Sequence, residues 1–104
     1  MNPQPKPRRV KNESYRQFVA GQPCFSCGVW GLSQACHPNG AGMGTKASDL
    51  ECFPLCCTRQ GIEGCHFRFD QCIGMTRMLR KELEAGYIAR MQAIARAAGR
   101  PEFK

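Results

Sequence analysis

The chain has 104 residues, which is enough for one small domain and excludes large multidomain enzymes, doubly wound cofactor-binding folds and long coiled coils. Hydrophobic residues make up 42% of it, so it is not disordered throughout, yet its apolar runs are far shorter than the roughly 20 residues that span a bilayer. Its 15 Lys and Arg against 8 Asp and Glu give a net charge of +7. Its 8 cysteines could stabilise a small core, either as disulfides or as metal ligands.

The N-terminal segment, residues 1–12, is basic and rich in proline, which predicts a disordered arm. No apolar segment typical of a secretory signal follows it. We therefore expect a cytoplasmic protein, in which cysteines are more often metal ligands or buried thiols than disulfides. A secreted, disulfide-rich protein that has lost its signal is the alternative.

The charge is concentrated at the two ends of the chain. Residues 1–23 carry a net charge of +4, residues 24–72 carry −1, and residues 73–104 carry +4. Both histidines and all the cysteines lie in the near-neutral middle. Basic flanks suit a polyanion, because each Lys or Arg that neutralises a phosphate releases counterions. DNA is thus the expected partner, with solubility as the alternative reason for the charge; no membrane partner is expected, because large apolar anchors are missing from the basic segments.

Six segments are predicted between the basic arm and the last helix. The first half contains a short helix over 13–20, ended by Gly21-Gln22-Pro23, and then a tight turn with short extended pieces over 24–36. A loop over 37–48 leads to a short strand over 49–55, which Pro54 restricts to a sheet edge. After a second loop, a helix is expected to start near Cys65.

The last segment, residues 73–104, is predicted to be a basic amphipathic helix packed on the domain or on a partner. Its apolar residues recur every three or four positions, at Leu79, Leu83, Tyr87, Met91, Ile94 and Ala98. Gly86 costs about 1 kcal/mol relative to Ala and could bend the helix, and Gly99 and Pro101 are expected to end it. The apolar stripe leaves both a monomer and a homodimer open.

The cysteine spacing predicts a structural zinc site. Cys24 and Cys27 form a C-x-x-C knuckle, and the glycine that follows lets the backbone turn so that amides face the sulfurs. Zinc needs two more ligands, for which Cys56 and Cys65 are the best candidates. Other cysteines held in reserve are Cys52, Cys57 and Cys72. A redox C-x-x-C is the rival interpretation, but the βαβ context that it normally has is missing.

Both histidines lie beside this proposed zinc site in the sequence. His37 precedes a glycine-rich loop that ends in Lys46 and Asp49. His66 directly follows a proposed ligand, and Asp70 lies four residues later on the same helix face. Such a His–Asp pair can share one divalent cation or form one hydrogen bond.

These pieces, in this order, resemble the phage-type HNH endonucleases, small ββα-metal proteins associated with recombination. The resemblance covers residues 24–71, about half the chain. Its matching residues are Cys24/Cys27/Gly28, Ala35/His37/Asn39, Gly42/Gly44/Lys46/Ala47/Ser48/Asp49, Leu55/Cys56 and Cys65/His66/Asp70/Gln71.

The resemblance implies a metal-dependent nuclease that hydrolyses phosphodiester bonds in DNA. His37 would activate water, and His66 would hold a divalent cation, magnesium or another, against the phosphate. Lys46 could contact the phosphate, while Asp49 and Asp70 could orient a histidine or complete the metal shell. A phage or prophage origin in a bacterial host, and a recombination protein as partner, are also implied.

Two positions depart from the family pattern. Cys36 stands where many members have a metal-binding Asp or His, and as a ligand it would favour a softer ion than magnesium. Asn39 is the nearest candidate for the middle asparagine of the family name. We expect a small α+β domain, with a ββα-metal core of the HNH (His-Me finger) class over 13–72, a zinc knuckle and a C-terminal helix. A zinc module that binds nucleic acid or protein without catalysis is the alternative.

Overall fold

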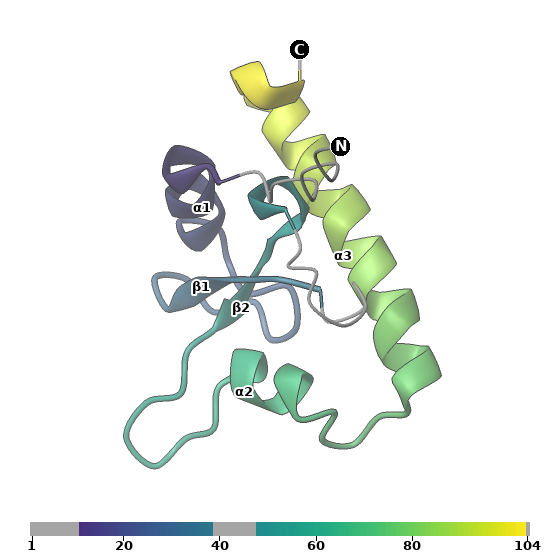
Figure 1. The fold of residues 1–104 in the computed structure, drawn as a ribbon. Helices are drawn as coiled ribbons and strands as arrows, with labels where there is room; N and C mark the ends of the chain where they lie inside the picture. The colour runs from purple at the N-terminus through teal and green to yellow at the C-terminus, as the bar shows by residue number, and fades with distance from the viewer. Residues whose placement is uncertain (1–10, 39–47, 104) are drawn as a thin grey trace, which may run out of the picture.

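The computed structural model describes residues 11–38 and 48–103 (Figure 1). It is a small α+β structure built on one two-stranded sheet. The elements in chain order are α1 (Glu13–Ala20), β1 (Ser33–Cys36), the 3-10 turn η1 (Asp49–Glu51), β2 (Phe53–Cys56), α2 (Cys65–Asp70), α3 (Arg77–Ala97) and the 3-10 turn η2 (Pro101–Phe103). Asn39 and Lys46, two of the predicted site residues, lie outside the described residues, as does most of the basic arm.

The sheet is an antiparallel hairpin whose register pairs Ser33 with Cys56 and Cys36 with Phe53. Every residue of β2 is buried. Figure 1 shows the reason: α3 runs along one side of the hairpin, α1 lies on the other side, and α2 lies below it. Pro54 is tolerated because a two-stranded sheet has only edge strands.

The predicted strand over 49–55 is wrong at its start. Residues 49–51 form a 3-10 turn instead, because the Ser48 hydroxyl accepts a hydrogen bond from the Leu50 amide (3.1 Å) and closes the turn. The strand begins at Phe53 and runs one residue further than expected, to Cys56.

The predicted helix over 13–20 is confirmed as α1. It begins after Asn12, whose side chain accepts a hydrogen bond from the Tyr15 amide (2.9 Å). Tyr15 and Val19, one turn apart, are the buried residues of the helix. The helix expected near Cys65 is confirmed as α2, which starts at that residue.

The C-terminal helix is confirmed as α3, and it passes through Gly86 without a break. Of the predicted apolar stripe, Met91 is buried and three residues pack against the core, namely Leu83, Tyr87 and Ile94. The stripe is wrong at its ends, since Leu79 and Ala98 are exposed. At the first end, buried Arg80 and Glu84 take the inward positions as a hydrogen-bonded pair (2.9 Å). Beyond the other end, Gly99 has φ 75° and ends the helix as expected.

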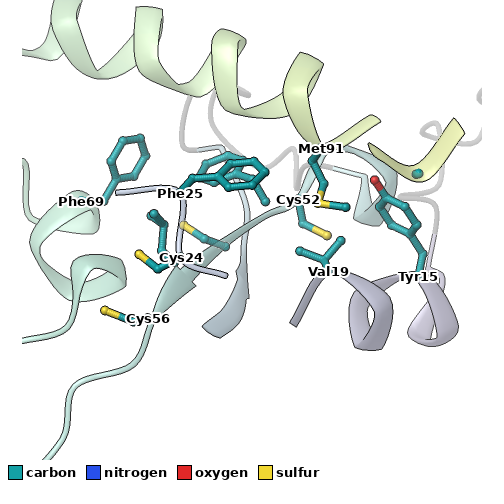
Figure 2. Packing of buried hydrophobic residues seen from close by; sticks show 12 residues of the cluster. Tyr15, Val19, Cys24, Phe25, Cys52, Cys56, Phe69 and Met91 are labelled. Atoms are coloured by element: carbon teal, nitrogen blue, oxygen red, sulfur yellow. The ribbon is translucent and has the colours of Figure 1, made fainter. Parts of the chain in front are cut away.

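The core joins these elements around packed aromatic rings and cysteines (Figure 2). The ring of Phe53 lies 5.6 Å from that of Phe69 and 5.4 Å from that of Tyr87. In Figure 2, Tyr15 and Met91 occupy one end of this cluster, while Cys24 and Cys56 occupy the other. Within the described ranges, no helix is both long and apolar enough to cross a membrane.

Candidate metal centres

Four cysteine sulfurs come together at one end of the core, and they are the four that the spacing predicts. Cys24 and Cys27 come from the turn before β1, Cys56 ends β2, and Cys65 begins α2. All four sulfurs lie within 4.8 Å of one another, and those of Cys27 and Cys56 are 3.8 Å apart. Sulfurs 2.3 Å from one tetrahedral zinc ion would be about 3.8 Å apart. This four-cysteine cluster could therefore hold a metal ion.

The backbone is shaped to this cluster. The amides of Ser26 and Cys27 both donate to Cys24 Sγ (3.4 Å), and the Cys65 amide donates to Cys56 Sγ (3.3 Å). Gly28 has φ 80°, the left-handed conformation that the predicted knuckle requires after its second cysteine. Amides aimed at the sulfurs stabilise thiolates, the form in which cysteine binds a metal.

Electrostatics within the cluster favour a cation. Burial raises the pKa of the Cys65 thiol to about 12, and the neighbouring sulfurs add to that rise. Burial also opposes ionisation of Cys56, but hydrogen bonds from the Cys65 amide and from Arg59 outweigh it and lower the pKa of Cys56 to about 6. The thiolate form is thus favoured at Cys56 and disfavoured at Cys65, where it would lie beside other negatively charged sulfurs. A divalent cation among the sulfurs would relieve the repulsion between thiolates.

The three reserve cysteines stay outside the four-cysteine cluster. Cys52 is buried in the core, and Cys57 and Cys72 are half-buried. Cys72 follows α2 with φ 53°, and the Arg80 guanidinium contacts its sulfur at 3.7 Å.

A second cluster gathers three different donors at the junction of the hairpin and α2. It consists of Cys36 at the end of β1 with His66 and Asp70 on α2, and their donor atoms lie within 4.8 Å of one another. Cys36 Sγ is 4.0 Å from Asp70 Oδ1, and His66 Nε2 is 3.4 Å from Asp70 Oδ2. Cys36 is buried, whereas the side chains of His66 and Asp70 are 26% and 42% exposed. This Cys36–His66–Asp70 cluster is therefore open to solvent on one side.

Neighbouring side chains orient these donors. His66 Nδ1 lies 3.0 Å from the Gln34 amide oxygen, which can only accept, so Nδ1 carries the proton and Nε2 is left to act as a ligand. Arg80 donates to the Asp70 carbonyl (3.1 Å), lies 3.7 Å from its carboxylate, and stacks 4.7 Å above the Phe69 ring. The second cluster is thus held by partners on β1 and on α3.

His37 belongs to a separate pair. Its Nε2 lies 2.8 Å from Asp49 Oδ1. Asp49 is 1% exposed and also accepts hydrogen bonds from the Asn12 amide (2.7 Å) and from Arg16 Nε (3.1 Å). An ionised carboxylate can only accept, so Nε2 of a neutral His37 carries the proton and Nδ1 is its basic nitrogen. The expectation that Asp49 orients a histidine agrees with this contact.

Sequence reasoning missed the residues that support these donors. Gln34 could have been found, because it is two residues from Cys36 on one strand and so shares its face. Arg80 carried no signal, since a basic residue on a basic helix is expected to face solvent.

Three further arginines of the C-terminal flank also make contacts within the chain: Arg90 with Phe25, Arg96 with Phe103, and Arg100 with Glu102.

Comparisons with known proteins place the chain among others of similar sequence. The family model DUF968, described as a protein of unknown function, matches residues 2–85, which include both clusters. The chain is also similar to the protein named "Uncharacterized protein YdfU" of Escherichia coli (strain K12), with 46% identity over 55 residues. That stretch is 50% of this chain and 16% of the relative, so the chain spans a small part of that protein. No solved structure matches the chain.

Proposed function

The chain belongs to the DUF968 family, and we propose that it is a metal-dependent, HNH-type endonuclease that hydrolyses phosphodiester bonds in DNA. One observation carries the proposal: a hairpin and the helix after it bring Cys36, His66 and Asp70 together, with an open side, beside a separate four-cysteine cluster. A closed set of four ligands is typical of a structural zinc site, and three protein ligands with an open position are typical of a catalytic one. The phage or prophage origin and the recombination partner belong to the same proposal.

The donor sets fit these two roles. Zinc in the four-cysteine cluster would hold the knuckle, the end of β2 and the start of α2 in place. A divalent cation held by the Cys36–His66–Asp70 cluster would supply Lewis-acid stabilisation of the charge that develops on the phosphate. Two ligand atoms of that cluster, His66 Nε2 and an Asp70 oxygen, already face each other at 3.4 Å.

His37 is the proposed general base. It follows Cys36, a proposed metal ligand, directly in the chain. Asp49 holds the imidazole through Nε2 and stabilises the imidazolium that forms when Nδ1 takes a proton from water. Arg16 and the Asn12 amide fix the Asp49 carboxylate in turn, so the ring is oriented by a buried acceptor.

DNA as the substrate is supported by charge. The net charge of +7 favours a polyanion, and α3 adds Arg77 and Lys81 as exposed cations near its start. Arg100 is paired with Glu102, whereas Arg90 and Arg96 stack on aromatic rings and remain exposed, so part of the C-terminal flank is left to contact phosphate. The alternative is a zinc module that binds nucleic acid or protein without catalysis.

The test is cleavage of supercoiled, linear, single-stranded and branched DNA with magnesium, manganese, cobalt, zinc or chelator. The wild type is compared with His37→Ala and with Gln17→Ala, an exposed control on α1. We expect nicking that needs a metal, falls about 10²- to 10⁴-fold in His37→Ala and persists in the control. A folded, zinc-loaded protein that binds DNA but cuts none of these substrates would favour the alternative.

A further inference from the structure

We infer that the Cys36–His66–Asp70 cluster selects a thiophilic divalent ion of the zinc class over magnesium. The inference deepens the proposed function, because it names the ion that the same site takes. It rests on the donor atoms present, which are one sulfur, one imidazole nitrogen and one carboxylate oxygen. Zinc and cobalt accept such a mixed set, whereas magnesium requires six oxygens at about 2.0–2.1 Å.

The sulfur is the fixed member of this set. Cys36 is fully buried at the end of β1, with its sulfur 4.0 Å from Asp70 Oδ1. A buried sulfur on the inner side of the site takes a position that magnesium would fill with a carboxylate or a water molecule. The structure therefore places a soft donor where a magnesium site needs a hard one.

The imidazole is also arranged for a transition metal. Gln34 accepts from His66 Nδ1 at 3.0 Å, which presents Nε2 to the cluster 3.4 Å from Asp70 Oδ2. A neutral imidazole held by an outer hydrogen bond is a common ligand of zinc, cobalt and nickel and an uncommon one of magnesium.

The net charge of the site weakens hard-ion binding further. Asp70 is the only carboxylate of the cluster, and the Arg80 guanidinium lies 3.7 Å from it. Magnesium binding depends mainly on negative charge, which a single carboxylate supplies here, while the charge of Arg80 is shared with Glu84, its closer partner at 2.9 Å. A metal–thiolate bond depends less on that charge, so the same surroundings leave zinc or cobalt binding favoured.

The experiment adds cobalt to the full chain already loaded with one zinc ion. Cobalt bound by a thiolate gives a near-ultraviolet charge-transfer band. We expect this band in the wild type and in Cys57→Ser, a half-buried cysteine outside both clusters, and its loss in Cys36→Ala. A thousandfold excess of magnesium should leave the band in place, while equimolar zinc should remove it.

A second variant guards against a folding failure at buried Cys36. His66→Gln changes a part-exposed side chain, leaves Cys36 in place, and should weaken cobalt binding at least about 10-fold. Retention of one zinc per chain and of the helical circular dichroism shows that each variant is folded.

The outcomes separate the inference from the proposed function. A thiolate band without DNA cleavage keeps the inference and overturns the nuclease. Cleavage supported by magnesium, with no band in folded wild type, keeps the nuclease and overturns the inference. A band that survives in folded Cys36→Ala overturns the assignment of the sulfur.

Discussion

Cys65 and His66 are consecutive residues at the start of α2, yet their side chains belong to different clusters. The Cys65 amide donates to Cys56 Sγ at 3.3 Å, on the four-cysteine side. His66 Nδ1 lies 3.0 Å from Gln34 Oε1, on the side of Cys36 and Asp70. The first turn of α2 therefore connects the two candidate metal centres, so an ion bound in the first fixes a ligand of the second.

The first prediction follows from the membership of Cys65 and His66 in different clusters. Cys65→Ser should abolish zinc binding in the four-cysteine cluster, unfold the domain or lower its melting temperature sharply, and weaken cobalt binding in the second cluster. The free energy of zinc binding in small metal domains is largely free energy of folding. His66→Gln should instead keep the zinc and the melting temperature while losing cobalt affinity.

Metal analysis and thermal unfolding on the same samples check this prediction, with Cys57→Ser as the control. Equal effects of Cys65→Ser and His66→Gln on both centres would contradict the one-way dependence. An unchanged melting temperature in a zinc-free Cys65→Ser would show that the cluster does not stabilise the fold.

The second prediction compares Gly64 with Gly86, because the space around the two glycines differs. A Cβ at Gly64, the N-cap of α2, would overlap the backbone of Cys56, Cys57 and Thr58, whereas a Cβ at Gly86 in α3 would meet nothing within 4 Å. Gly64→Ala should therefore move Cys65 away from Cys56, destabilise the domain and weaken zinc binding. Gly86→Ala should stabilise it by about 0.4–1 kcal/mol.

Urea unfolding and competition with a zinc chelator measure both effects of the glycine substitutions. Gly64→Ala with unchanged zinc affinity would mean that the loop between Cys56 and Cys65 adapts without cost. A destabilising Gly86→Ala would mean that α3 needs its flexibility there.

The members of the four-cysteine cluster were predictable because the chemistry of a metal site restricts the choice. A C-x-x-C turn needs two further thiols, and Cys56 and Cys65 lie at the ends of a strand and a helix, where they can reach it. The second cluster was predictable only in part. His66 and Asp70 share a helix face by spacing, but the addition of Cys36 depends on how the hairpin packs on α2.

Two features of the fold were not predicted, the buried Arg80 and the 3-10 turn at 49–51, and both depend on hydrogen bonds and packing rather than on an apolar pattern. A buried Arg80 contradicts the ordinary preference of arginine for solvent, and it is tolerated because Glu84, the Asp70 carbonyl and the Phe69 ring surround its guanidinium. Similarly, the strand predicted over 49–55 included residues 49–51, but the Ser48 hydroxyl caps a 3-10 turn there. Tertiary packing and local side-chain hydrogen bonds decided both, and neither appears in an apolar pattern.

Tyr15 provides a prediction about pH. Burial raises the pKa of this phenol to about 12, with the nearby Cys52 and Glu102 adding to the rise, and its hydroxyl has no hydrogen-bond partner among the described residues. The unfolded chain ionises near pH 10 and the folded chain only near 12, so stability is lost as pH rises through that window. The loss is at most about 3 kcal/mol.

Comparison with Tyr15→Phe isolates that contribution from those of other titrating groups. At pH 7 the variant should be as stable as the wild type or slightly more stable, because it removes a buried polar atom without a partner. Between pH 10 and 12 the wild type should fall behind the variant in urea unfolding. A constant difference between the two across this range would show that Tyr15 does not titrate differently on folding.

Asp49 carries the last prediction, because it meets His37 at 2.8 Å while being 1% exposed. Asp49→Asn keeps the size of the side chain but removes the charge that stabilises an imidazolium on His37. We expect DNA cleavage to fall at least about 10-fold, and by less than in His37→Ala, since an amide still holds the ring. Stability should fall by about 1–3 kcal/mol, because Arg16 and the Asn12 amide lose a charged acceptor.

Arg16→Met separates these two effects of Asp49. Its guanidinium contacts the far oxygen of the same carboxylate, Oδ2, at 3.1 Å and is 44% exposed, so its loss removes an ion pair but leaves the His37–Asp49 contact in place. This variant should lose some stability and keep most of its cleavage rate. If Asp49→Asn and Arg16→Met lower cleavage equally, or if neither does, Asp49 acts only as an anchor between α1 and η1. If only Asp49→Asn slows cleavage at a temperature where both variants are folded, the carboxylate acts through His37.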